Sequence, residues 1–224
     1  KPSPTGGEAD TKYRGDPRWA ALVTALFFVV LGAGILGHEM WRDEWQAWML
    51  ARDSGTPLEL LRNLRYEGHP PGWYLLLWGI TRFTRNVAAM QVLHLLIATG
   101  SVYLLTRYAP LPRSYRLLIA FGYFFLYEYG VISRSYALGV LGLFAFCALF
   151  PVRRKRPVAV TCSLLVLSSA IVYGMIIAIA IGTVLLGEYV YAQFREGHWK
   201  MPRPAVVVGA LVSVVLLGLL ILQL

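Results

Sequence analysis

Long apolar runs joined by short polar segments make up most of this chain. The runs lie at about 19–37, 71–83, 87–106, 115–130, 134–150, 158–172, 174–193 and 205–224. Several of them approach the roughly 20 residues that a helix needs to cross a bilayer. One longer polar stretch, about 38–70, separates the first run from the second. The pattern predicts an all-α polytopic membrane protein with about 7–8 membrane segments.

The run at 71–83 allows two interpretations. It is shorter than a full span, and counting it as one breaks the alternation of basic and non-basic loops. A short re-entrant or interfacial helix that begins and ends on the outer side resolves the conflict, because such segments are tolerated when they are buried in protein. The alternative is a full span that places Arg82 and Arg85 inside. We expect the first form.

Composition supports the membrane class and argues against nucleic acid as a partner. Hydrophobic residues make up 57% of the chain and charged residues only 15%, whereas a soluble domain carries about 25% charged residues. The net charge is +9, but the basic residues cluster in short loops between apolar runs, as the positive-inside rule predicts. The two cysteines, Cys147 and Cys162, indicate neither a disulfide framework nor a thiolate metal site.

The basic loops also predict the orientation and the domain boundaries. The densest basic run, 153–156, belongs in the cytoplasm by the positive-inside rule, and alternation then puts 38–70 outside. We expect a flexible cytoplasmic tail over 1–17 and a membrane module over 18–195. Residues 196–224 are expected to form a cytoplasmic loop and a further transmembrane helix, in a chain that is incomplete at its C-terminus.

The outer loop 38–70 predicts two short helices that lie along the membrane surface. Residues 41–54 read as the first helix, whose face bearing Trp41, Trp45 and Trp48 would contact lipid headgroups. The second helix begins at Pro57, a favoured residue in the first turn, and continues to about Tyr66.

Three polar clusters fall on the same predicted side of the membrane. They are Asp43-Glu44, Glu67-Gly68-His69-Pro70-Pro71 and Ser133-Arg134-Ser135-Tyr136. An acid pair near a helix start is by itself a common solvated feature, because the helix dipole favours it. Ionisable groups at membrane depth are costly, however. Three clusters that converge on one membrane face therefore predict a functional site.

The order of these motifs resembles the GT-C superfamily of polyprenyl-phosphate-dependent glycosyltransferases, and in particular its protein-mannosyltransferase-like branch (glycosyltransferase family 39-like). The similarity covers roughly residues 18–195, and its matching pieces are Asp43-Glu44 in RDEWQAW, His69-Pro70-Pro71 with Trp73-Tyr74, and Arg134 with Tyr136-Ala137-Leu138. It implies a GT-C-like helical bundle. One departure is Ile132, where family members often carry an acid, and Glu128 is a candidate replacement that would pair with Arg134.

The resemblance implies transfer of a sugar from a polyprenyl-phosphate-linked donor to an extracytoplasmic acceptor glycan, lipid or protein. Among the catalytic residues, Asp43 would act as the base, with Glu44 beside it. Arg134 would hold the donor phosphate, because a guanidinium binds phosphate with two parallel hydrogen bonds. The other donor-binding residues would be His69, Tyr74 and Tyr136. We expect Asp43 and Arg134 to stand far enough apart to admit a sugar.

No cofactor is required by this chemistry, although an acid pair could hold a divalent cation. The expected location is the bacterial inner (plasma) membrane, with membrane lipid around the chain, further membrane subunits as candidate partners and the active site on the extracytoplasmic side. Two rival functions stay open. One is a non-catalytic GT-C-like subunit or scaffold of a larger membrane complex, since a fold can persist without activity. The other is a transporter subunit, which would spread polar residues through the helix midplane.

Overall fold

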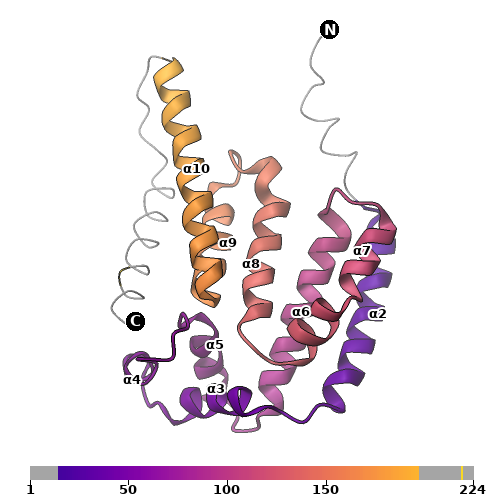
Figure 1. Cartoon of the computed structure of the whole chain (residues 1–224), viewed down its shortest axis with the longest axis vertical. Helices are drawn as coiled ribbons and strands as arrows, with labels where there is room; N and C mark the ends of the chain where they lie inside the picture. Colours follow the sequence, from indigo (N-terminus) through magenta and orange to yellow (C-terminus); the bar gives the residue numbers. More distant parts are fainter. Residues whose placement is uncertain (1–14, 197–217, 219–224) are drawn as a thin grey trace.

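The computed structural model describes residues 15–196 and Gly218, and this part of the chain contains helices and no strands. Most of the expected tail 1–17 and of the segment 196–224 lies outside these described residues. The elements, in chain order, are α2 (Pro17–Leu36), α3 (Arg42–Asp53), α4 (Pro57–Asn63), α5 (Gly72–Thr81), α6 (Ala88–Tyr108), α7 (Arg113–Ala120), the π-helix η1 (Phe124–Val131), α8 (Tyr136–Leu149), the short 3₁₀-helix η2 (Phe150–Val152), α9 (Pro157–Ala170) and α10 (Val172–Glu196) (Figure 1).

Three helices are long and apolar enough to cross a membrane by length and composition. They span Pro17–Leu36, Ala88–Tyr108 and Val172–Arg195. Two shorter apolar helices, Tyr136–Val152 and Pro157–Ala170, accompany them. The predicted all-α class, with helices suited to a membrane, therefore agrees with the structure at this level.

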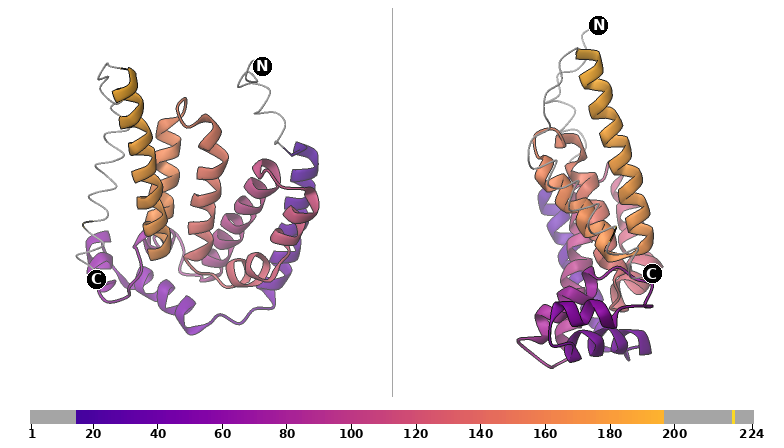
Figure 2. Two further views of the ribbon diagram at one scale, coloured as in Figure 1. Left: turned by 45° about the horizontal axis from the view of Figure 1, so that its top comes forward. Right: turned by 90° about the vertical axis from the view of Figure 1, so that its left-hand side faces the viewer.

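The helices run back and forth between two ends of an elongated bundle (Figures 1 and 2). One end carries α3, α4 and α5, and we call it the loop end. The other carries the α8–α9 connection with the basic run 153–156, and we call it the basic end. The segment between η1 and α8 returns to the loop end. The structure thus places 38–70 and Arg134 together at the end opposite to 153–156.

α5 begins and ends at the loop end, as the re-entrant interpretation of 71–83 predicts (Figure 1). The helix has ten residues, too few to cross the roughly 30 Å of a hydrocarbon core at 1.5 Å per residue. Its first residue, Gly72, lies against α9 so closely that a Cβ would come within 2.5 Å of the Ser169 carbonyl oxygen. Glycine therefore lets the start of α5 reach the end of α9.

Close backbone contact also joins the pair α8 and α9. A Cβ on Gly142 would lie 2.7 Å from the backbone nitrogen of Leu167. Small residues permit such approaches between helices in membranes, where packing and not the hydrophobic effect drives association.

The two expected short helices are present as α3 and α4, but the three tryptophans do not share one exposed face. Trp41 and Trp45 are 45% and 41% exposed, whereas Trp48 is 1% exposed and packs in the core beneath α3 and α5. The expectation is therefore wrong for Trp48. Trp41 is an N-cap with extended backbone, so helical periodicity does not apply to it. Trp45 and Trp48 stand about 60° apart on the helix, enough to separate an exposed edge from a buried face.

Candidate functional site

An ion pair between Asp43 and Arg134 forms the centre of the candidate site. Asp43 lies in the first turn of α3, and Arg134 lies in the segment between η1 and α8. The Arg134 guanidinium also stacks over the Trp41 ring, 5.3 Å from its centroid. The side chains of Asp43 and Arg134 are 47% and 26% exposed, so both are accessible from solvent.

Glu44 is fully buried and fixes the position of this pair. Its Oε1 accepts a hydrogen bond from the Ser133 backbone N–H at 2.7 Å. Its Oε2 accepts one from the Trp41 backbone N–H at 2.8 Å and lies 2.8 Å from His38 Nε2. A buried carboxylate is stable only when such donors surround it. Because Glu44 has no contact with solvent, its geometry suits positioning of Asp43 and Arg134 better than contact with a substrate.

The second polar cluster joins α3 through Glu67. Gln46 donates a hydrogen bond to Glu67 Oε1 at 2.8 Å. Burial raises the pKa of Tyr74 to about 12, and the negative charges of Glu67 and Asp43 act in the same direction. The phenol of Tyr74 is therefore neutral near physiological pH and shares a neighbourhood with the two carboxylates.

The remaining donor-binding candidates, His69 and Tyr136, contact other residues than the ion pair. His69 is exposed, and its Nδ1 lies 2.9 Å from the Glu67 carbonyl oxygen. The Tyr136 ring packs against Tyr129, with 5.8 Å between centroids. No hydrogen bond joins His69 or Tyr136 to Asp43 or Arg134 within residues 15–196.

Two expectations about Arg134 are wrong. Its partner is Asp43 and not Glu128, whose carboxylate accepts a hydrogen bond from the Tyr123 hydroxyl at 3.4 Å. Asp43 and Arg134 are also in direct contact and leave no sugar-sized gap between them. Ile132, which departs from the resembled motif, is completely buried.

Several buried polar atoms have no hydrogen-bond partner in the described part of the chain, among them Trp73 Nε1, His94 Nδ1, Ser133 Oγ and Arg134 Nε. The rings of Trp73 and His94 meet edge to face, 5.8 Å apart, and His94 Nε2 lies 3.1 Å from the Tyr129 carbonyl oxygen. Unpaired buried polar groups are uncommon and costly. Ser133 and Trp73 belong to the motifs of the predicted site, whereas His94 was not among the predicted site residues.

The π-helix η1 ends just before Ser133 and Arg134 and positions them at the site. In η1 the hydrogen bond from the Ile132 N–H reaches the Tyr127 carbonyl oxygen, five residues back, at 3.3 Å. Gly130 makes this wide turn fit, since a Cβ there would lie 2.6 Å from the Phe125 carbonyl oxygen and 2.9 Å from Leu31 Cδ1. Segments of π-helix are rare and occur frequently at functional sites. The apolar run at 115–130 gave no sign of it.

The residues 15–196 and Gly218 hold no group of three or more His, Cys, Asp or Glu side chains placed to bind a metal ion. No protein-family model, curated protein or solved structure matches the chain. The chemistry of the site is therefore the basis for a functional proposal.

Proposed function

We propose that this protein is a membrane glycosyltransferase with a GT-C-like bundle, which transfers a sugar from a polyprenyl-phosphate-linked donor to an extracytoplasmic acceptor. The proposal rests mainly on one observation. The accessible pair Asp43–Arg134 is held at the loop end of an apolar bundle by the buried carboxylate of Glu44. A lipid-linked donor has a polar head and an apolar tail, so its reaction belongs at such a boundary.

The two members of the pair match the two demands of the reaction. The Asp43 carboxylate takes the proton of an acceptor hydroxyl as its oxygen attacks the anomeric carbon. The bond from that carbon to the phosphate oxygen breaks, and the prenyl phosphate leaves with its negative charge stabilised by Arg134. Glu44, which follows Asp43, accepts the hydrogen bond of the Ser133 N–H, which precedes Arg134, and so holds the two groups beside each other.

The closed ion pair is compatible with this chemistry if the donor phosphate competes for the guanidinium. A guanidinium carries five N–H donors, and the contact with Asp43 uses Nη2. Arrival of a phosphate at Arg134 would weaken that contact and free Asp43 for proton transfer. His69, at the loop end, would approach the phosphate or sugar from the side of α5, with Tyr74 next to it.

A second candidate is a non-catalytic GT-C-like subunit of a membrane complex. The direct contact of Asp43 with Arg134 favours it, since a permanent ion pair would join α3 to the start of α8 and do no chemistry. A transporter subunit finds less support, because the candidate site gathers at one end of the bundle.

The test is a direct transfer assay on the purified chain, with a panel of polyprenyl-phosphate sugars and a separate measurement of donor binding. Asp43→Asn should abolish transfer and leave donor binding largely intact. Arg134→Ala should weaken donor binding by about 1.5–3 kcal/mol, the contribution of a charge-assisted hydrogen bond. Asp53→Asn, an acid at the other end of α3, and Arg62→Ala on α4 are the matched controls.

Full transfer activity in Asp43→Asn would disprove the role of Asp43 as base. Donor binding without transfer by the wild-type chain would favour the non-catalytic subunit. Absence of both binding and transfer across the panel would overturn the proposed donor class.

A further inference from the structure

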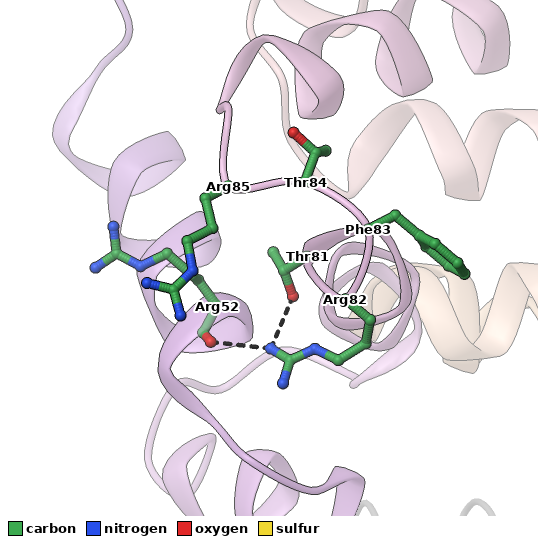
Figure 3. Close-up of a pocket in the computed structure, with 6 residues that line it drawn as sticks. All are labelled: Arg52, Thr81, Arg82, Phe83, Thr84 and Arg85. Atoms are coloured by element: carbon green, nitrogen blue, oxygen red, sulfur yellow. Dashed lines mark hydrogen bonds between the residues drawn. The ribbon is translucent and has the colours of Figure 1, made fainter.

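A second polar site lies at the far end of α3. A cavity of about 370 Å³ opens where α3 ends and α5 turns toward α6, and its lining residues are Arg52, Thr81, Arg82, Phe83, Thr84 and Arg85 (Figure 3). Arg52 follows Asp43 by nine positions on α3, which corresponds to roughly 13 Å along the helix axis. The cavity is therefore separate from the Asp43–Arg134 pair.

The three arginines in the cavity carry more positive charge than their surroundings neutralise. Arg52 forms a two-bonded pair with Asp53, with nitrogen–oxygen distances of 2.7 and 2.9 Å. This pairing lowers the pKa of Asp53, and the charge of Arg85 contributes to the same effect. Asp53 is thus already engaged as the counter-charge of Arg52.

The other two guanidinium groups have no carboxylate partner in residues 15–196. Arg82 donates hydrogen bonds to neutral oxygens, the Arg52 carbonyl at 2.9 Å and the Thr81 hydroxyl at 3.0 Å (Figure 3). Arg85 makes no hydrogen bond or ion pair within the described residues. Guanidinium groups in this state suit an anion with several oxygens, and phosphate is the group whose geometry they match best.

Aromatic side chains beside the cavity indicate a lipid as the source of the phosphate. Phe83, between the two arginines in sequence, is 93% exposed. The Trp78 ring lies 5.1 Å from the Arg82 guanidinium carbon. Aromatic and basic side chains occur together where a protein meets the headgroup region of a bilayer. A free phosphate ion would gain nothing from an exposed phenylalanine, whereas an acyl chain would pack against it.

We propose that this cavity binds the phosphate of an anionic lipid headgroup. Arg82 and Arg85 contact the phosphate oxygens, and Phe83 enters the boundary between headgroups and acyl chains. Such a lipid would hold the loop end at the membrane surface independently of any reaction at Asp43.

The experiment titrates phosphatidylglycerol into the purified chain in detergent and counts bound lipid by native mass spectrometry. Arg85→Gln should lower the affinity about tenfold, the loss expected for one charge-assisted contact. Arg82→Gln should also weaken binding, while Arg62→Gln, an exposed arginine on α4, should not. Phosphatidylcholine, whose headgroup carries a compensating cation, should bind more weakly than phosphatidylglycerol to the wild-type chain.

Two further measurements separate a lipid from a free ion. Inorganic phosphate should displace phosphatidylglycerol poorly, and Phe83→Ser should reduce lipid binding. If inorganic phosphate competes as well as the lipid and Phe83→Ser changes nothing, the site takes a free anion and the lipid assignment is wrong. If Arg85→Gln and Arg82→Gln bind phosphatidylglycerol as Arg62→Gln does, the site itself is disproved.

Discussion

The buried carboxylate of Glu44 accepts a hydrogen bond from the backbone N–H of Ser133, 89 positions further along the chain. This bond connects the first turn of α3 to the segment that carries Arg134. The ion pair between Asp43 and Arg134 lies directly beside it. Of the two adjacent acids, Asp43 is exposed and can meet a substrate, whereas Glu44 is buried and supports the structure around it.

Glu44→Ala should lower the free energy of unfolding strongly. The substitution leaves the buried N–H of Ser133 and the partly buried N–H of Trp41 without their acceptor, and loss of one partner from a buried charged network costs about 3–5 kcal/mol. Denaturant unfolding in detergent measures the effect. Glu39→Ala, at an exposed acid of the same loop, is the control, and an equal result for both would show that Glu44 does not stabilise the fold.

The Asp43–Arg134 pair should contribute little to stability. Both side chains are partly exposed, and such pairs contribute about 0–1 kcal/mol. A double-mutant cycle with Asp43→Asn and Arg134→Gln should therefore give a coupling free energy within that range. A coupling several times larger would indicate a structural lock and would favour the non-catalytic subunit.

The burial of Tyr74 should make the free energy of unfolding fall at alkaline pH. Its pKa is raised from 10.0 to about 12, so the unfolded chain loses this proton at lower pH than the folded chain does. The corresponding stability is complete below pH 10 and is lost as the pH rises to about 12, on the order of 2–3 kcal/mol. Unfolding measured at both ends of this window should show a smaller loss in Tyr74→Phe than in the wild type. Tyr66→Phe, at an exposed tyrosine, should behave as the wild type.

The loop end should face the outside of the cell. In a background with Cys147→Ala and Cys162→Ala, a membrane-impermeant maleimide should label Arg62→Cys in intact cells. It should label Lys155→Cys only after permeabilisation, because the basic run 153–156 favours the cytoplasm. The reverse pattern would move the candidate site to the cytoplasmic side and contradict the proposed acceptor.

Gly142→Ala should destabilise the contact of α8 with α9. The added Cβ would lie 2.7 Å from the Leu167 backbone nitrogen, and overpacking of this kind costs about 1–3 kcal/mol. Gly182→Ala on α10, where nothing lies within 4 Å of the new Cβ, is the matched control and should be neutral or slightly stabilising. Thermal unfolding of the two variants distinguishes them.

Hydrophobic patterning predicted the helical class, the two short helices of the first long loop and the position of both ends of α5 at the same end of the bundle. These features depend on run length and on loop charge, both of which are local. The pairing of Arg134 with Asp43 in place of Glu128 was not predicted, because Glu128 is nearer in sequence while Asp43 is nearer in the fold.

The buried position of Trp48 and the unpaired atoms of Trp73 and His94 were missed for a related reason. Whether a tryptophan faces lipid or a neighbouring helix depends on which helix packs there, and periodicity within one helix does not contain that information. The π-helix η1 was missed because its residues, FFLYEYGV, form an apolar run like any other.

The form of η1 makes the length of its segment part of the site. In η1 the Ile132 N–H bonds to the carbonyl five residues back, so removing one residue between Tyr123 and Arg134 would change the turn of this segment. The guanidinium would then move away from Asp43 even though the motif residues themselves were unchanged. Two chains could then share the acid pair, the histidine and the arginine in the same order and yet differ in whether these groups meet. For this fold, the number of residues between motifs encodes an angle, and a comparison of such proteins has to count them.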